Sequence, residues 1–244
     1  MVNTMKNRKL IIGCIIVFFL LWVLGADMYR RNYYPAMQEV SGVIEEVTTI
    51  SIEEMDKGLA FIPQNPKVGL IFYPGAMVEY TAYAPLMMEY AKEGVLCVLL
   101  EMPLSLAVLD MEAAEGVSNS YPQVTSWYVG GHSLGGAAAS NFLVETSEHF
   151  DGLLLLAAYS NVDLSDSDWK VISIYGEFDE VLNHDAFNEY DVNLPDSTYT
   201  FEISGGNHSN FAYYGNQAGD GVASISREEQ IASTVQFSLN YMFE

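Results

Sequence analysis

The sequence predicts an α/β fold in which a mostly parallel central sheet is covered by helices on both faces. Segments with strand character alternate with segments of helical character from about residue 58 onward, a pattern typical of parallel sheets. The central strands, such as 95–102 and 152–159, are continuous apolar runs, as expected for strands buried on both faces. With 244 residues, half of them hydrophobic, the chain is long enough to bury one sizeable core.

The first elements of this fold follow a short N-terminal region. The range 40–52 is rich in Val, Ile and Thr and is expected to form a strand. Two apolar runs, 58–63 and 67–74, are separated by a turn containing Pro and Asn, which predicts an antiparallel hairpin at the start of the sheet. The range 85–93 has Pro85 in its first turn and Gly94 after its last residue, so we expect a helix there.

The later elements alternate more regularly. A capping box formed by Ser226 and Glu229 predicts that the last helix begins there, and we expect it to run to about Met242. Between residues 94 and 226 we expect strands at 95–102, 126–130, 152–159, 170–176 and 198–204, and helices at 104–115 and 134–145.

Charge is distributed unevenly along the chain. The formal net charge is −22, yet residues 1–31 hold five of the ten basic residues. Residues 32–244 hold the other five against 31 acidic residues, a formal charge of −26. Such a domain repels polyanions, so we expect no nucleic-acid partner. Cys14 and Cys97 lie in separate apolar runs, which predicts neither a disulfide nor a cysteine-rich metal site.

The range from Leu10 to Ala26 is 17 residues without a charge, flanked by basic residues on both sides. This length is at the short end for a membrane span, and Trp22 and Tyr29 suit the membrane interface. We therefore expect a retained signal anchor over residues 1–28. We expect the anchor to be followed by a juxtamembrane connector over 29–39 and a folded domain over 40–244.

The N-terminal segment has two other interpretations. A cleaved signal peptide with a site near Gly25 or Ala26 is one, and a lipoprotein signal ending at Cys14 is the other. Lys6, Arg8 and Lys9 precede the apolar run and favour an N-terminus inside the cell. The expected location is the cell membrane, crossed once, with the acidic domain outside the cytoplasm.

The most informative motif follows the strand at 126–130. Gly131-His132-Ser133-Leu134-Gly135 matches G-x-S-x-G between a predicted strand and a predicted helix. In a nucleophile elbow this turn exposes the serine hydroxyl, and the glycines are needed because neighbouring backbone approaches too closely for a Cβ. Ser133 is therefore the candidate nucleophile, with a structural glycine-rich turn as the alternative.

Two further strand ends supply the partners that a serine nucleophile needs. Asp179 follows the strand at 170–176 and is the candidate for the carboxylate that orients a histidine. His208 lies on a glycine-rich loop after the strand at 198–204, where it is expected to reach Ser133 as general base. His132 is expected to point away from Ser133, and His149 and His184 to be exposed. The competing carboxylates near Asp179 are Glu177, Glu180 and Asp185.

The loop after the strand at 67–74 is the candidate second half of an oxyanion hole. One backbone N–H is expected from Leu134, the residue after the nucleophile. Ala76 is the preferred second donor and Met77 the alternative, with Gly75 leaving room for a substrate carbonyl.

The order Ser133, Asp179, His208 along the chain is that of the α/β-hydrolases. The segments FYPGAMVEYTAYAPL, VGGHSLGGAAA, DGLLLLAAYS, YGEFDE and GGNHSNFAYYGNQAGDG resemble a bacterial subgroup of this superfamily related to dienelactone hydrolases and carboxylesterases. The resemblance implies an α/β-hydrolase fold with a small or absent cap, since only ten residues, three of them acidic, separate Tyr159 from Lys170. It also implies the triad and oxyanion hole given above. Dienelactone hydrolases proper use cysteine where this chain has Ser133.

The glycine-rich loop 214–221 is a further element of the resemblance. Its Gln217 and Asp220 are expected to hold the His208 loop in place, with substrate contact as the alternative.

The function that these residues predict is a membrane-anchored serine hydrolase, of carboxylesterase type, which cleaves a small acyl ester through an acyl-enzyme on Ser133. This chemistry needs neither a metal nor an organic cofactor. The alternatives are a thioesterase, peptidase or acyltransferase that uses the same triad, and a catalytically silent binding module.

Overall fold

A computed structural model of the chain describes residues 17–21, 23–45 and 49–243. The chain divides into two compact units, residues 1–33 and residues 34–244. In the first unit, residues 17–21 and 23–32 are helical, and Arg31 forms an ion pair with Asp27 at 2.6 Å. Most of the predicted anchor lies outside the described residues. Within the described ranges, no helix combines the length and the apolar character that a membrane crossing requires.

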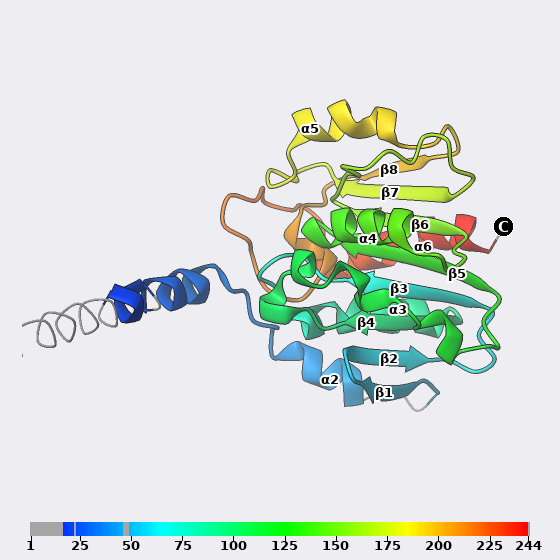
Figure 1. The fold of residues 1–244 in the computed structure, drawn as a ribbon, viewed down its shortest axis with the longest axis horizontal. Coiled ribbons are helices and arrows are strands. Elements are labelled where there is room, and N and C mark those ends of the chain that lie inside the picture. The colour runs from blue at the N-terminus through cyan, green and yellow to red at the C-terminus, as the bar shows by residue number, and fades with distance from the viewer. Residues whose placement is uncertain (1–16, 22, 46–48, 244) are drawn as a thin grey trace, which may run out of the picture. The chain divides into compact units, whose positions relative to one another are not determined.

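The second unit is built on one eight-stranded sheet (Figure 1). The strand order is β1-β2-β4-β3-β5-β6-β7-β8. The six strands β4, β3, β5, β6, β7 and β8, in this spatial order, run parallel to one another. β1 and β2 form an antiparallel hairpin at one edge of the sheet, and β2 pairs antiparallel with β4. The bounds are β1 Ser51–Met55, β2 Gly58–Ile62, β3 Val68–Tyr73, β4 Val95–Leu100, β5 Ser126–His132, β6 Gly152–Leu156, β7 Lys170–Gly176 and β8 Tyr199–Ile203.

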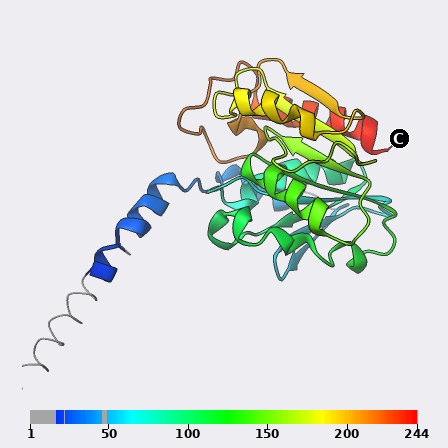
Figure 2. The same cartoon turned by 45° about the horizontal axis from the view of Figure 1, so that its top comes forward.

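Helices cover both faces of the sheet, as Figures 1 and 2 show. On one face α3 and α6 pack over a core that contains Tyr83 and Leu86, and on the other α4 packs over a core that contains Phe142. This two-sided burial is why β3, β4 and β6 are apolar along their whole length. The helices are α2 Glu39–Glu45, α3 Ala84–Lys92, α4 Leu134–Glu145, α5 His184–Glu189 and α6 Arg227–Met242, and 3₁₀ turns occupy Tyr80–Tyr83, Pro103–Ser105, Ala107–Leu109, Met111–Ala114, Ser118–Ser120, Tyr190–Asn193 and Ser209–Phe211.

The hairpin at the start of the sheet has different partners from those predicted. The run 58–63 forms β2, but it pairs with β1 and β4 rather than with β3. The tight turn lies at residues 56–57, before Gly58, whose φ of 134° suits glycine. The Pro-containing turn at 63–67 instead carries the chain past β4, which lies between β2 and β3.

Two other segments also differ from expectation. Within the range 40–52, predicted as a strand, residues 40–45 belong to helix α2 and residues 51–52 begin β1, while 46–48 lie outside the described residues. The range 104–115, predicted as one helix, forms three short 3₁₀ turns, because Leu104 and Ser105 adopt φ of 50° and 52°, which no α-helix contains. Elsewhere the predicted alternation is confirmed: α4 has the predicted bounds, and α6 begins with the predicted capping box.

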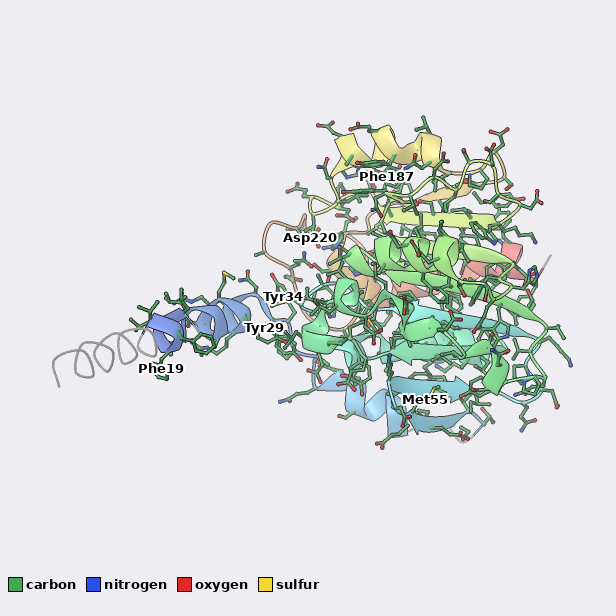
Figure 3. All side chains as sticks on the ribbon, viewed as in Figure 1. Phe19, Tyr29, Tyr34, Met55, Phe187 and Asp220 are labelled. Atoms are coloured by element: carbon green, nitrogen blue, oxygen red, sulfur yellow. The ribbon has the colours of Figure 1, made fainter. Side chains whose placement is uncertain are left out.

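Residues 34–38, which we expected in a connector, belong to the second unit and pack against its loops. Tyr34 forms a β-bridge with Val78, just after the loop that carries Ala76. Its hydroxyl accepts a hydrogen bond from Ala218 N at 3.1 Å, and its ring packs edge-on against Tyr214. Figure 3 labels Tyr34 and also Asp220, which lies on the same long loop as Ala218. The first residues of this unit therefore contact two of the loops that follow strands β3 and β8.

Candidate active site

Ser133 occupies the sharp turn between β5 and α4. Its φ of 53° and ψ of −124° lie outside the regions that residues with a side chain ordinarily adopt. The turn is held by a hydrogen bond from Ser133 N to Leu156 O at 2.9 Å. A Cβ on Gly131 would lie 2.3 Å from the Gly135 carbonyl carbon, and one on Gly135 would lie 2.3 Å from Tyr73 O. The two glycines are therefore required by backbone that cannot move aside, as the nucleophile-elbow hypothesis expects.

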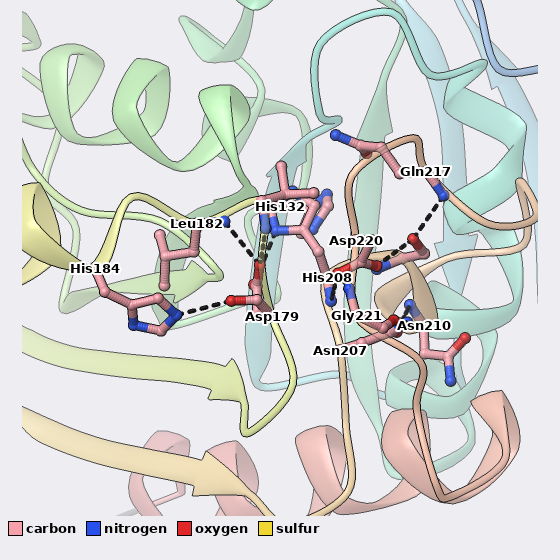
Figure 4. Close-up of polar contacts among 12 residues, drawn as sticks. His132, Asp179, Leu182, His184, Asn207, His208, Asn210, Gln217, Asp220 and Gly221 are labelled. Atoms are coloured by element: carbon pink, nitrogen blue, oxygen red, sulfur yellow. Dashed lines mark hydrogen bonds and ion pairs between the residues drawn. The ribbon is translucent and has the colours of Figure 1, made fainter.

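Asp179 and His208 meet at the carboxyl ends of β7 and β8. Asp179 Oδ2 lies 2.8 Å from His208 Nδ1, and both side chains are buried. Asp179 Oδ1 accepts hydrogen bonds from the backbone N–H groups of Val181 and Leu182 at 3.1 and 2.8 Å, so the carboxylate is fixed by its own loop (Figure 4). Because a carboxylate oxygen can only accept, this arrangement places a proton on His208 Nδ1 and leaves Nε2 as the nitrogen that can accept a proton from a substrate or nucleophile.

Ser133 and His208 line the same cavity, which has a volume of about 560 Å³. His208 Nε2 is buried and makes no hydrogen bond to any residue that the structure describes. A buried polar atom without a partner costs free energy, and catalytic hydrogen bonds often form fully only when substrate is bound. Nε2 is therefore available to accept a proton from a group in the cavity.

The competing carboxylates are placed differently. Glu177 accepts hydrogen bonds from Ser204 Oγ and Gly205 N at 2.9 and 2.8 Å, so it ties β7 to the turn after β8. Glu180 and Asp185 are exposed. Of these four acidic residues, Asp179 alone contacts His208. Among the described residues, no group of three or more His, Cys, Asp or Glu side chains is arranged to hold a metal ion.

The backbone N–H groups of Ala76 and Leu134 have no hydrogen-bond acceptor among the described residues. The Ala76 loop lies against the elbow, since a Cβ on Gly135 would be 2.5 Å from Pro74 O. Met77, the alternative donor, has φ of 60° and its N–H donates to Ser105 O at 2.8 Å. That N–H is already used, which leaves Ala76 and Leu134 as the candidate pair.

A buried polar chain links this loop to the elbow, and sequence reasoning missed it. Gly75 N donates to the Tyr83 hydroxyl at 3.0 Å, and that hydroxyl lies 2.7 Å from His132 Nδ1. The His132 ring in turn lies 4.4 Å, centroid to centroid, from the His208 ring. Gly75 makes room for this chain, because a Cβ there would lie 2.8 Å from the Tyr83 hydroxyl and 2.9 Å from His132 Nδ1.

The protonation of this chain follows from burial. Burial raises the pKa of Tyr83 far above its usual range, so the hydroxyl keeps its proton. Burial, and then the neighbouring His208, hold the pKa of His132 well below its usual range, although the His208 backbone acts in the opposite direction. Since the Tyr83 oxygen accepts from Gly75, its proton points to His132 Nδ1, and neutral His132 carries its own proton on Nε2.

His132 does not line the cavity that contains Ser133, in keeping with the expectation that it points away. His149 is exposed, as expected. His184 is exposed too, and its Nε2 lies 2.8 Å from Asp179 O (Figure 4).

The loop 214–221 holds the backbone around His208. Asp220 Oδ1 accepts from His208 N at 3.2 Å, and Oδ2 accepts from Ser209 N and Ser209 Oγ at 2.8 and 2.5 Å. Gln217 N donates to Ser209 Oγ at 2.9 Å, and Gln217 Oε1 accepts from Tyr214 at 3.1 Å. Neither Gln217 nor Asp220 lines the cavity. Their contacts are those of residues that support the loop.

Several solved structures share this fold. A dienelactone hydrolase from Anabaena variabilis has a TM-score of 0.58 at 16% identity, over 80% of this chain and 98% of that one. Est1E from Butyrivibrio proteoclasticus has a TM-score of 0.54 at 14% identity, over 81% of this chain and 100% of that one. TT1662 from Thermus thermophilus has a TM-score of 0.59 at 14% identity, over 79% and 98%.

A search of curated proteins finds no significant match. The model of the alpha/beta hydrolase family, however, matches residues 69–232, which include the elbow, Asp179, His208 and the loop 214–221. The chain therefore belongs to the α/β-hydrolase family.

Proposed function

We propose that this protein is a serine hydrolase, of carboxylesterase type, that cleaves acyl esters through a covalent acyl-enzyme on Ser133. The observation that carries the proposal is the bond between Asp179 and a buried His208 whose Nε2 is unpartnered beside the cavity that Ser133 lines. Membership of a hydrolase family supports it.

The mechanism follows from the positions of these groups. Ser133 Oγ attacks the ester carbonyl carbon while its proton passes to His208 Nε2. Asp179 stabilises the imidazolium that results, and the N–H groups of Ala76 and Leu134 bind the oxygen that becomes negative. The carbon–oxygen bond to the alcohol then breaks, and the alcohol leaves with the proton from Nε2.

The second half of the reaction repeats these steps with water. A water molecule attacks the acyl carbon and gives a proton to His208. The bond to Ser133 Oγ breaks, Oγ recovers its proton, and the carboxylic acid is released. Thioester, amide and acyl-acceptor chemistry would use the same groups, and the choice between them is an outcome of the substrate test below.

The test is hydrolysis of short p-nitrophenyl esters, thioesters and anilides by the full chain. Ser133→Ala is expected to abolish turnover of the preferred substrate. Ser173→Ala is the matched control: Ser173 is buried in β7, its hydroxyl has no partner among the described residues, and it does not line the cavity. Ester turnover that survives Ser133→Ala in folded protein would contradict the proposal.

We further propose that the apolar range from Leu10 to Ala26, with its basic flanks, anchors the protein in the cell membrane. Replacing two leucines in this range by aspartate is expected to move the full chain from the membrane to the soluble fraction. An unchanged distribution would contradict anchoring without bearing on the hydrolase proposal.

A further inference from the structure

The cavity beside Ser133 is lined by no acidic or basic side chain other than the candidate base. Its fifteen lining residues include no Lys, Arg, Asp or Glu, and His208 is its single histidine. The domain that surrounds it holds five basic residues, none of which lines it. Lys57 and Lys92 are paired with Asp110 and Glu89 at 2.7 and 2.5 Å. An anionic group entering this cavity would therefore meet no Lys or Arg side chain to pair with.

One wall of the cavity runs along α4 from the elbow. Leu134, Ala137, Ala138 and Asn141 all lie on this helix and line the cavity. Since a helix rises 1.5 Å per residue, Asn141 lies about 10 Å beyond Leu134. The wall is therefore apolar beside the reacting carbon and polar about 10 Å away.

The polar end of the wall is made of uncharged amides. Asn141 Nδ2 donates to Ala137 O and to Asn161 Oδ1 at 2.7 and 2.8 Å. Asn141 Oδ1 and Asn161 Nδ2 have no partner among the described residues. Asn183 Oδ1 accepts from Ala186 N, which leaves its Nδ2 likewise available to a ligand. The cavity thus presents both donors and acceptors, but no full charge.

An aromatic side chain also lines the cavity. Tyr159 lines the cavity, and its ring stacks on Tyr190 at 5.3 Å with an angle of 7° between the planes. Stacking fixes the ring as a flat wall, which suits a compact uncharged group better than a hydrated ion.

We infer that the cavity binds the acyl half of the substrate, and that it selects acyl groups that are apolar near the ester and end in a neutral hydrogen-bonding group. This inference rests on the proposed function. The carbonyl oxygen is held at Leu134, the first residue of α4, so an acyl chain continuing along that helix meets Ala137 and then the Asn141–Asn161 amide pair. Acyl groups that end in a carboxylate are turned over with a lower kcat/KM than their neutral counterparts.

The test compares two p-nitrophenyl esters that differ only in terminal charge, the suberic acid monoamide and the suberic acid half-ester. Roughly eight bonds separate the ester carbonyl carbon from the terminal nitrogen or oxygen atom. An extended zigzag chain advances about 1.25 Å for each bond of about 1.5 Å, so this atom lies about 10 Å from the ester carbon. The expected ratio of kcat/KM, amide over carboxylate, is on the order of 100 for the wild-type protein, because a bound carboxylate has no cationic partner. A ratio within threefold of one would overturn the inference.

A charge-introducing variant gives the second arm of the test. Asn161→Arg supplies the missing cation and is expected to raise kcat/KM for the carboxylate ester, so that the amide-over-carboxylate ratio falls at least tenfold. Asn240→Arg is the matched control, since Asn240 is exposed near the end of α6 and does not line the cavity. A ratio that narrows equally in both variants would show that the field of the acidic domain, rather than the cavity, discriminates, and would overturn the inference.

Failure of the inference and failure of the proposed function give different results. p-Nitrophenyl acetate is too short to reach Asn141, so its turnover monitors the catalytic groups alone. Loss of the discrimination with acetate turnover intact overturns the inference and leaves the proposed function standing. No Ser133-dependent turnover of any of these esters overturns both.

Discussion

Replacing Tyr83 by Phe would remove one hydroxyl that joins the oxyanion loop to the elbow. That hydroxyl accepts from Gly75 N at 3.0 Å and lies 2.7 Å from His132 Nδ1. Gly75 and His132 are both buried, so no water replaces the lost partner. The ring itself stays, because Phe fills the same space.

The expected loss of stability in Tyr83→Phe follows from the two groups that it leaves unpaired, Gly75 N–H and His132 Nδ1. Each buried polar group without a partner costs about 1–3 kcal/mol, so the free energy of unfolding is expected to fall by about 2–6 kcal/mol. Gly75 precedes Ala76, whose N–H is the candidate oxyanion donor. We therefore expect kcat to fall roughly 10- to 100-fold with a smaller change in KM, because a small displacement of a catalytic group costs about this much.

Urea unfolding followed by circular dichroism measures the first effect, and ester hydrolysis measures the second. Tyr90→Phe is the matched control, since Tyr90 is also fully buried and Ser238, at 2.6 Å, is the one described residue to which its hydroxyl bonds. It is expected to cost about 1 kcal/mol of stability and to leave kcat unchanged. If Tyr83→Phe behaves like Tyr90→Phe in both assays, the polar chain does not position the site.

Three further changes test other parts of the account. Asp179→Asn is expected to lower kcat by about 10⁴-fold, because an amide donor facing Nδ1 moves the His208 proton to Nε2. Pre-steady-state kinetics measures the acylation rate, and a much smaller fall in that rate would contradict the role of Asp179. The free energy of unfolding of the wild-type protein is expected to fall below about pH 6.5, by up to about 1.4 kcal/mol per pH unit. The pKa of His132 is lowered in the folded protein, so below this pH the unfolded chain binds a proton that the folded chain does not. In His132→Asn the free energy of unfolding should therefore fall less steeply with decreasing pH, and an unchanged slope would contradict this assignment. Gly131→Ala is expected to destabilise the fold by about 3 kcal/mol or more, because the new Cβ meets fixed backbone. Gly42→Ala, in exposed helix α2 with nothing within 4 Å, should instead stabilise the fold by up to about 1 kcal/mol in the same denaturation assay, because Ala favours the helix.

The elements that sequence predicts well are those whose pattern is local. The bounds of α4 follow from the elbow glycines and an apolar run, and the start of α6 follows from one capping box. The placement of Ser133, Asp179 and His208 after parallel strands brings them to one edge of the sheet, because parallel strands share a direction.

The elements that sequence missed depend on contacts between distant parts of the chain. The partner of β2 is decided by β4, which inserts between β2 and β3 and is about 40 residues away. The bond between Tyr83 and His132 joins residues 49 positions apart, and nothing in either local pattern indicates it. The one local signal is Gly75, which the sequence predicts to leave room for a substrate carbonyl and which also makes room for this pair.

The central claim is that Ser133 is the nucleophile, and covalent labelling tests it most directly. A fluorophosphonate probe reacts with a serine whose hydroxyl is activated by a general base. Incubation with the probe, followed by intact-mass measurement and peptide mapping, is expected to show one adduct per chain, on Ser133, and none in Ser133→Ala. Folded protein that stays unlabelled, or that is labelled equally after Ser133→Ala, would contradict the account.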